Sequence, residues 1–268
     1  MIKLIALDLD NTLLNSQKQI SPANERELRR LHEAGMKVVL CTGRPINAIW
    51  NYIEQLGLTE PEDATITFNG GLVLDNTTRK VLAQRGMSKQ ALQPLYQFAK
   101  EQGVPLDVLD FDRVYPVNDL GSSIYRDKLN GKIDFEPRSF VDLPEQEYAK
   151  GILANTSAEL DQLQRALPDS VKQQYHIVRS QPEILEFLPP KVDKAVGLAD
   201  LLHHFGWDFS NLMAFGDAEN DAGMLEKAAV GVAMGNASPE IKQIANYITT
   251  TNDADGVAVF LSQYFPKE

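Results

Sequence analysis

Two aspartates close the first apolar stretch of the chain, and they stand one residue apart. Asp8 and Asp10 follow the run "KLIAL" at residues 3–7. In an extended chain, residues i and i+2 project to the same face, so the two carboxylates are neighbours. At about 4 Å, two like charges repel by roughly 4 kcal/mol at an effective dielectric near 20. A divalent cation between the acids would offset this repulsion.

A second pair of acids follows another apolar run far along the chain. Asp217 and Asp221 lie in "GDAEND", directly after the run at 211–215. If both runs are strands of one parallel sheet, the acids that follow them meet at one sheet edge. Carboxylate oxygens suit Mg²⁺, so the sequence predicts a magnesium site there. A simple capping turn explains Asp8 and Asp10 alone, but it leaves the second pair unexplained.

A hydroxyl, a glycine and a lysine stand at comparable junctions. Thr42 and Gly43 follow the run at 36–41. Backbone N–H groups at a strand-to-helix junction favour an anion, although an ordinary turn accounts for these two residues equally well. Lys194 precedes an expected helix at 195–206, and by itself it is typical of an exposed charge. The residues that follow strands, and Lys194 with them, are expected to converge where open α/β sheets bind ligands.

Other catalytic chemistries lack the residues that they need. In a cysteine phosphatase, Cys41 would need an arginine six positions on, where Asn47 stands, so a buried strand residue is predicted. No P-loop or dinucleotide-binding glycine motif occurs. The four histidines form no metal-binding or triad pattern: His32, His176, His203 and His204.

The elements that must position these residues alternate in the first and last thirds of the chain. Strands are expected at 3–7, 36–44, 64–74 (broken at Gly70–Gly71), 211–217 and 230–234, and helices at 21–35, 45–57, 195–206, 221–229, 238–248 and 255–265. Apolar strands that alternate with helices predict an α/β fold with a doubly wound parallel sheet.

The middle of the chain breaks this alternation. Helices are expected there at 88–103 and 157–169, among segments of alternating polarity such as 105–117 and 182–190. This α+β pattern predicts a separate module at 84–190, inserted into a core made of 1–83 and 191–268.

Composition bounds the class of partner. The net charge of −11 and the pI near 4.9 argue against a nucleic acid, whose binding needs clustered basic residues. A small anionic substrate stays compatible, because a metal ion and a lysine reverse the sign of the charge locally. A single cysteine excludes an internal disulfide. Without a secretory signal or a membrane-spanning run, we expect a cytoplasmic protein with no membrane association; its oligomeric state is open.

In their order along the chain, "DLDNTLL" at 8–14, "CTGR" at 41–44, a lysine before a helix and "GDAEND" at 216–221 resemble the haloacid dehalogenase-like (HAD) hydrolases. The similarity is specifically to the Cof-type subfamily, which includes YidA-like sugar phosphatases, and it covers essentially the whole chain. The module at 84–190 resembles that subfamily's α/β cap. The resemblance implies a Rossmann-like core and a Mg²⁺-dependent phosphatase that acts on small phosphorylated metabolites.

The resemblance also implies a role for each matching residue. Asp8 would be the nucleophile that forms an aspartyl phosphate, and Asp10 the general acid/base, with its main-chain carbonyl on the metal. The implied phosphate-binding set is Leu9 (through its amide), Thr42, Gly43, Lys194 and Asn220. The implied metal set is Asp8, Asp10, Asp217 and Asp221, the last as a ligand or as a supporting acid behind the ligands.

Two positions depart from the family pattern: Asn11 and Ala195 each stand where glycine is usual. Asparagine tolerates left-handed backbone angles, so we expect the turn at Asn11 to form. The implied chemistry is physically sound, because a metal ion, Lys194 and amides offset the repulsion between a carboxylate and a phosphate dianion. To protonate the leaving oxygen, Asp10 must carry a proton, so its pKa is expected to be raised.

Three other functions also depend on aspartates: those of a phosphomutase, of a receiver-type signalling module and of an aspartic protease. A phosphomutase shares the covalent chemistry and stays open. A phosphate-accepting signalling module of the receiver type is much shorter and has no large insertion. An aspartic protease would need two Asp-Thr/Ser-Gly loops, which are not in the sequence. Sugar, nucleotide, flavin and pyridoxal phosphates all stay open as substrates, and the cap residues that could face the site are Asp110, Asp112, Arg113 and Tyr125.

Overall fold

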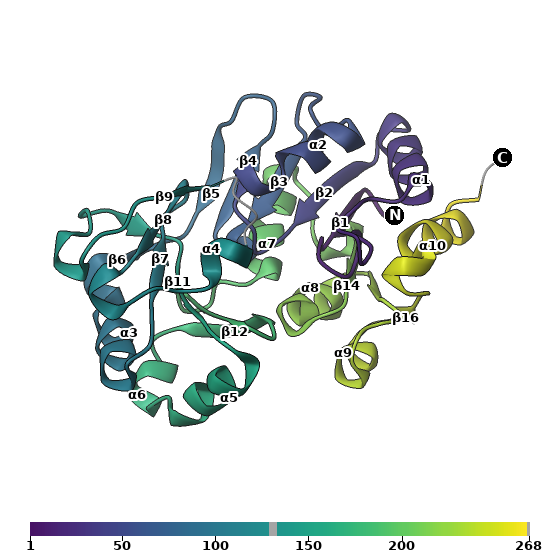
Figure 1. Cartoon of the computed structure of the whole chain (residues 1–268). Coiled ribbons are helices and arrows are strands. Elements are labelled where there is room, and N and C mark those ends of the chain that lie inside the picture. Colours follow the sequence, from purple (N-terminus) through teal and green to yellow (C-terminus); the bar gives the residue numbers. More distant parts are fainter. Residues whose placement is uncertain (129–132, 267–268) are drawn as a thin grey trace. The chain divides into compact units, whose positions relative to one another are not determined.

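The computed structural model describes residues 1–128 and 133–266 (Figure 1). The chain forms two compact units: unit 1 comprises residues 1–84 and 193–268, and unit 2 comprises residues 85–192. Each unit has its own sheet and its own apolar core. No helix in the described residues is long and apolar enough to cross a membrane.

The sheet of unit 1 has eight strands in the order β16-β15-β14-β1-β2-β3-β4-β5. Six are parallel: β1 (Leu4–Leu7), β2 (Lys37–Cys41), β3 (Ala64–Thr67), β14 (Leu212–Gly216), β15 (Val230–Ala233) and β16 (Tyr247–Ile248). At one edge, β4 (Leu72–Asp75) and β5 (Val81–Gln84) run antiparallel. The central strands are fully buried, as expected of a parallel sheet that is covered on both faces.

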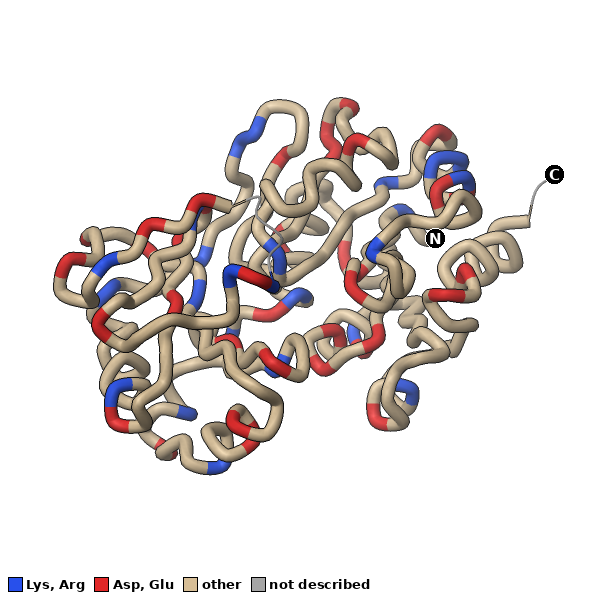
Figure 2. Tube along the Cα trace, viewed as in Figure 1, with Lys and Arg blue, Asp and Glu red and all other residues tan. Residues whose placement is uncertain are grey.

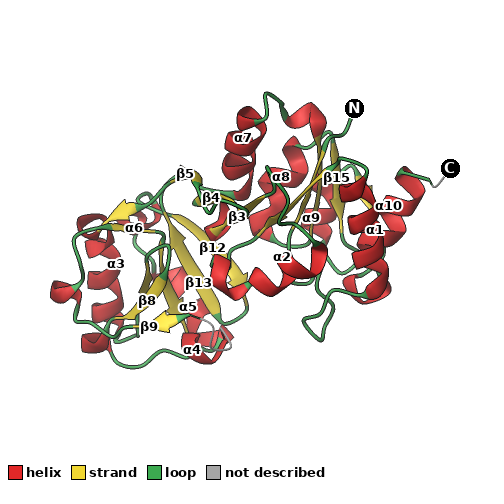
Figure 3. Cartoon of the chain, turned by 90° about the horizontal axis from the view of Figure 1, so that it is seen from above, coloured by secondary structure: helices red, strands yellow, loops and turns green. Residues whose placement is uncertain are grey.

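The helices of unit 1 cover both faces of this sheet (Figure 3). They are α1 (Pro22–Glu33), α2 (Trp50–Leu56), α7 (Lys194–His204), α8 (Ala222–Lys227), α9 (Pro239–Ile244) and α10 (Gly256–Tyr264). Alternate residues of β1 point into two different clusters: Ile5 packs with α1, α2 and α10, and Leu4 packs with α7, α8 and α9. The predicted doubly wound sheet is therefore confirmed.

Three local elements differ from the expectation. The stretch 64–74 forms a hairpin, in which β3 and β4 are joined through a 3₁₀ turn at Phe68–Gly70. The helix expected at 45–57 is split into a 3₁₀ turn, Ile46–Ala48, and α2. The helix expected at 238–248 ends at Ile244, because Tyr247 and Ile248 pair with β15 and extend the sheet. Tertiary pairing outweighs helical periodicity at that edge.

Unit 2 contains a six-stranded sheet in the order β12-β13-β11-β7-β8-β9, in which only β8 and β9 pair in parallel. Its strands are β7 (Asp107–Leu109), β8 (Arg113–Pro116), β9 (Asp134–Phe135), β11 (Lys150–Ala154), β12 (His176–Gln181) and β13 (Ile184–Leu188), with β6 (Met87–Ser88) and β10 (Glu147–Tyr148) as a separate pair. The helices are α3 (Lys89–Gln102), α4 (Tyr125–Lys128), α5 (Ser157–Ala166) and α6 (Asp169–Lys172). Leucines of α3 and α5 form its main core with the strands.

Acidic and basic residues are interspersed along the chain in both units (Figure 2). In the residues that the structure describes, no basic stripe of the kind that binds a nucleic-acid backbone stands out in that view.

Candidate active site

Three of the expected residues follow neighbouring strands at one edge of the unit 1 sheet. β1 pairs with β2 on one side and with β14 on the other. Asp8, Thr42 and Asp217 come directly after these three strands. The amides of Asp8 and Thr42 continue the sheet ladders, bonding Phe215 O at 3.1 Å and Ile66 O at 2.9 Å. Their positions are thus set by the sheet itself.

Lys194 begins α7 and is completely buried. Its ammonium Nζ lies 2.5 Å from Asp8 Oδ1 and 2.6 Å from Asp221 Oδ1. The Asp193 side chain caps the helix by accepting the Val196 amide at 2.8 Å. Burial alone would lower the pKa of Lys194, but the two carboxylates raise it above the ordinary value. The lysine is therefore held as a cation against both acids.

Three acids gather around this lysine. Asp8, Asp217 and Asp221 each offer a carboxylate oxygen, and these oxygens lie within 4.8 Å of one another. Asp221 Oδ2 accepts the amides of Asp217 and Ala218 at 2.8 and 3.0 Å. Burial, reinforced by Asp221, raises the pKa of Asp217 to about 7, and burial raises that of Asp8 despite Lys194. Three carboxylates against one ammonium leave surplus negative charge, which fits a hard divalent cation.

Asp10 differs from its expected state. Arg44 contacts its carboxylate twice, with Nε 2.8 Å from Oδ2 and Nη2 2.6 Å from Oδ1, and Lys18 Nζ lies 2.8 Å from Oδ1. Burial raises the pKa of Asp10, but the hydrogen bonds and charges of Arg44 and Lys18 outweigh it, and the net pKa is lowered. The expected raised pKa is wrong for this arrangement, because two cations from elsewhere in the chain hold the ionised form. Its carboxylate also lies outside the three-acid cluster of the described residues.

Three of the five expected phosphate-binding residues lie against a residue that was not expected, Asn69. Asn220 Nδ2 donates to Asn69 Oδ1 at 3.0 Å. Thr42 is buried, and its carbonyl accepts the Asn69 amide at 3.0 Å. A methyl group added at Gly43 would lie 2.9 Å from Asn69 Nδ2. Leu9, the remaining member of the set, is also buried.

Comparison with known proteins identifies the family. Residues 5–261 match the family model of the haloacid dehalogenase-like hydrolases. The chain belongs to this family. YitU of Bacillus subtilis, a 5-amino-6-(5-phospho-D-ribitylamino)uracil phosphatase, is 31% identical over 285 residues, which cover 98% of this chain and 97% of YitU. The resemblance to Cof-type phosphatases is confirmed, and the chain is a phosphatase of this family.

Solved structures agree over the whole length. A haloacid dehalogenase-like hydrolase from Bacteroides thetaiotaomicron has a TM-score of 0.86 at 31% identity, covering 99% of this chain and 100% of the other. The HAD subclass IIB sugar phosphatase BT4131 has a TM-score of 0.82 at 25% identity, covering 98% of both chains. The α/β fold of this HAD phosphatase is therefore shared with both.

Three further residues contact the candidate site and were not expected from the sequence: Thr12, Arg44 and Asn69. Thr12 is buried, and its hydroxyl donates to Asp217 Oδ1 at 2.9 Å. Thr12 and Arg44 lie inside the motifs at 8–14 and 41–44, but a motif does not show which side chains its residues contact across the fold. Asn11 has a φ of 58°, which confirms its left-handed turn. Cys41 is buried and burial raises the pKa of its thiol, which excludes a reactive thiolate.

The candidate cap residues mostly build unit 2 itself. Asp110 Oδ1 accepts the amides of Asp112 and Arg113, each at 2.7 Å, which closes the β7–β8 turn. Arg113 Nη1 lies 2.7 Å from Glu136 Oε2. Tyr125 is buried at the start of α4. The turn contacts give Asp110 a structural role within unit 2.

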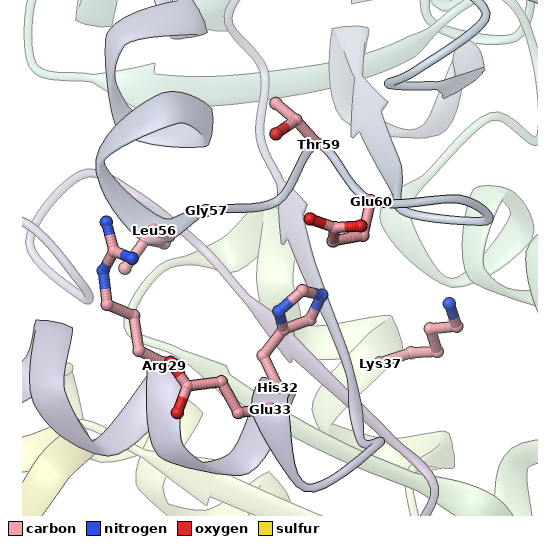
Figure 4. Close-up of a pocket in the computed structure, with 8 residues that line it drawn as sticks. All are labelled: Arg29, His32, Glu33, Lys37, Leu56, Gly57, Thr59 and Glu60. Atoms are coloured by element: carbon pink, nitrogen blue, oxygen red, sulfur yellow. The ribbon is translucent and has the colours of Figure 1, made fainter.

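A cavity of about 540 Å³ lies at the opposite end of β2 from Thr42 (Figure 4). Half-buried Arg29, His32 and Lys37 face it from α1 and the start of β2, and its lining is completed by Glu33, Leu56, Gly57, Thr59 and Glu60. His32 Nε2 lies 2.8 Å from the buried Asp63 Oδ1. None of the expected catalytic residues lines this cavity, so it is separate from the candidate active site.

Proposed function

We propose that this phosphatase hydrolyses small sugar phosphates with Mg²⁺, through an aspartyl phosphate formed on Asp8. The observation that carries the proposal is the buried contact of Lys194 with Asp8 and Asp221 inside a cluster of three acids. A carboxylate that is fixed by an ammonium at the end of a strand is a positioned nucleophile, and covalent catalysis splits the displacement into two easier steps.

Each of the chain's own groups has a task in this reaction. An oxygen of Asp8 attacks phosphorus, and the bond from phosphorus to the leaving oxygen breaks. Lys194 holds Asp8 and offsets the charge of the phosphoryl group, while Thr42 and Asn220 orient it. Asp10 is the proposed acid that protonates the leaving oxygen and the base that then accepts a proton from the attacking water. Because Arg44 and Lys18 hold its carboxylate in the ionised form, the acid role requires that substrate binding first displace these cations. Water attack on the aspartyl phosphate releases inorganic phosphate and restores Asp8.

The donor set suits a magnesium ion. Asp8, Asp217 and Asp221 would hold it, together with the main-chain carbonyl of Asp10. When bound, the ion would supply positive charge that lets a carboxylate approach a phosphate dianion. The surplus of negative charge in the cluster supports this assignment, because it is the environment that attracts such an ion.

Unit 2 is the proposed cap that selects the leaving group. Two relatives guide the choice of substrate: BT4131 is named a sugar phosphatase, and YitU acts on a phosphorylated ribityl compound. Both descriptions share a phosphate ester on a hydroxylated carbon chain. We therefore propose sugar phosphates as the substrate class and polyol phosphates such as the ribityl ester as the nearest competitors.

The test is hydrolysis of p-nitrophenyl phosphate with and without Mg²⁺, with the wild type beside Asp8→Asn. We expect metal-dependent release of phosphate that is lost in the variant. Glu226→Gln, which changes an exposed acid on α8, is the matched control and should keep full activity. A panel of hexose, pentose, ribityl and nucleotide phosphates then ranks the leaving groups by kcat/KM.

Three outcomes would change the proposal. Full activity of Asp8→Asn would remove the nucleophile assignment. Transfer of phosphate between positions of a sugar without release would favour a phosphomutase. If the wild type is inert toward the whole panel, a metal-dependent BeF₃⁻ adduct at Asp8 distinguishes an enzyme with a narrower substrate from a protein that never forms the aspartyl phosphate.

A further inference from the structure

The turn that follows β3 has an unusual backbone. Phe68 and Asn69 have φ values of 52° and 53°, and Gly70 follows with 95°. Positive φ is uncommon for any residue with a side chain and especially for a bulky one such as phenylalanine. Both Phe68 and Asn69 are buried, at 1% exposure each. Strain of this kind persists only where the surroundings over-determine it, and it gathers at functional sites.

The contacts of Asn69 join three strand ends. Its amide donates to Thr42 O at 3.0 Å, after β2, and its side-chain oxygen accepts Asn220 Nδ2 at 3.0 Å, after β14. Its side chain also lies against Gly43, where an added methyl group would approach Asn69 Nδ2 to 2.9 Å. One side chain at the end of β3 thus contacts the loops that carry three proposed phosphate-binding residues.

The same turn packs against the helix that carries Lys194. A methyl group added at Gly70 would lie 2.0 Å from Asp193 O, and one added at Gly197 would lie 2.8 Å from Gly70 Cα. Only residues without side chains allow this approach. The position of the Asn69 side chain is therefore fixed relative to the first turn of α7 as well as to the sheet.

We infer that Asn69 is a positioning residue for phosphoryl transfer and that it acts through Asn220; this inference rests on the proposed function. An amide carries two N–H donors. Because Asn69 Oδ1 accepts one of them, the plane of the Asn220 amide is set, and with it the direction of the second donor. The strained backbone of the turn keeps the acceptor at the point where Asn220 needs it.

A double-mutant cycle tests this coupling. Asn69→Gly removes the acceptor and still permits a φ of 53°, so it preserves the turn better than alanine would. We expect Asn69→Gly and Asn220→Ala each to lower kcat/KM by about tenfold, as the loss of one oriented hydrogen bond predicts. The kcat/KM of the double variant should lie within about twofold of that of Asn220→Ala, because without the Asn220 amide Asn69 has no group to orient. The dissociation constant of inorganic phosphate, measured by calorimetry, should show the same non-additivity.

Thr67→Val is the control on the same strand. Thr67 is buried, and its hydroxyl has no hydrogen-bond partner among the described residues, so valine should leave both kcat/KM and phosphate binding unchanged. Thermal unfolding of every variant separates loss of the fold from loss of positioning.

Two results would overturn the inference. The first is a kcat/KM of Asn69→Gly equal to that of the wild type. The second is a loss of kcat/KM in the double variant of about a hundredfold, the product of the two single losses. Multiplying losses would mean that Asn69 acts on the fold and not through Asn220. Failure of the proposed function is seen separately, as full activity of Asp8→Asn, and the phosphate-binding cycle still decides the coupling in that event.

Discussion

Among the described residues, each unit of this molecule buries one lysine almost completely, and the two lysines are partnered differently. In unit 1, Lys194 lies between the carboxylates of Asp8 and Asp221, with Asp217 in the same acid cluster. In unit 2, Lys150 on β11 is 1% exposed, and its Nζ lies 2.8 Å from Glu186 Oε2 on β13. One lysine faces an excess of acid, and the other has a partner of equal and opposite charge.

This difference in partners indicates that Lys194 belongs to a functional site and that Lys150 belongs to a structural ion pair. Glu186 Oε1 accepts the Ser180 hydroxyl at 2.8 Å, so both carboxylate oxygens in the ion pair of unit 2 are hydrogen-bonded. A buried charge is tolerated when it is paired in this way. In the cluster of unit 1, three carboxyl groups face one ammonium, and burial raises the pKa of both Asp8 and Asp217, so the excess acid needs a proton or a bound cation to offset it. A fold that needed only stability would not keep that surplus, so it points to chemistry.

The largest expected effect comes from removing each lysine and measuring turnover. Lys194→Met should lower kcat by at least about 10³-fold, because both the charge on the phosphoryl group and the hold on Asp8 are lost. Lys150→Met should leave kcat per folded molecule within about threefold. Far-UV circular dichroism and urea unfolding of each variant normalise the rates to folded protein. Similar losses of kcat in both variants would erase the distinction between the two lysines.

The second effect is on stability, and it belongs to unit 2. Lys150→Met should lower the free energy of unfolding by about 3 kcal/mol, because Glu186 would then be a buried charge without its cation. Lys150→Met/Glu186→Leu should recover most of this loss, since an apolar pair removes both charges. Urea unfolding measures both variants. If the double variant is as unstable as Lys150→Met, the lost stability does not come from the unpaired charge of Glu186.

Much of the unit 1 site follows from local pattern. Asp8, Thr42 and Asp217 end apolar runs, and once those runs are parallel strands the residues have to meet at one edge. Local pattern does not identify Lys194, because a lysine before a helix is common. Only its contacts with Asp8 and Asp221 distinguish it from an exposed lysine. The doubly wound sheet followed for the same reason: strand and helix periodicities are local properties of the sequence.

The features that were missed depend on tertiary contacts. The ionised state of Asp10 depends on Arg44 and Lys18, which reach it from other segments. The short strand β16 forms because Tyr247 and Ile248 pair with β15, although the helical periodicity of the sequence continues through them. No local pattern states which side chain will accept a hydrogen bond across the fold, and Asn69 was missed for that reason.

A further buried acid extends the comparison, because no lysine among the described residues is paired with it. Asp107 on β7 is 1% exposed, and its Oδ2 has no partner among the described residues. Burial raises its pKa to about 6, although Ser123 and Arg126 act in the opposite direction. The folded state therefore binds the proton more tightly than the unfolded chain, and this acid costs stability progressively as the pH rises from about 4 to 6.

Asp107→Asn removes that cost. At pH 8 the variant should be more stable than the wild type by up to about 3 kcal/mol, the free-energy equivalent of a shift of roughly two pKa units. The gain should shrink as the pH falls below 6. Urea unfolding of both proteins at pH 5 and pH 8 measures it, and a gain that is equal at the two values would mean that Asp107 is already ionised in the folded state at pH 5, so that burial does not raise its pKa.

The smallest expected effect tests the acid surplus directly, by binding a cation to it. A ligand that binds only the folded state stabilises it by RT ln(1 + [L]/Kd), so Mg²⁺ at ten times its Kd should add about 1.4 kcal/mol to the free energy of unfolding. Asp217→Asn should lose most of this gain, because it removes one of the three clustered carboxylates. Glu186→Gln is the matched control: it neutralises an acid that is already balanced by Lys150, so Mg²⁺ should stabilise that variant as much as the wild type. Equal stabilisation of Asp217→Asn would place the cation elsewhere and would leave the surplus at Lys194 without its explanation.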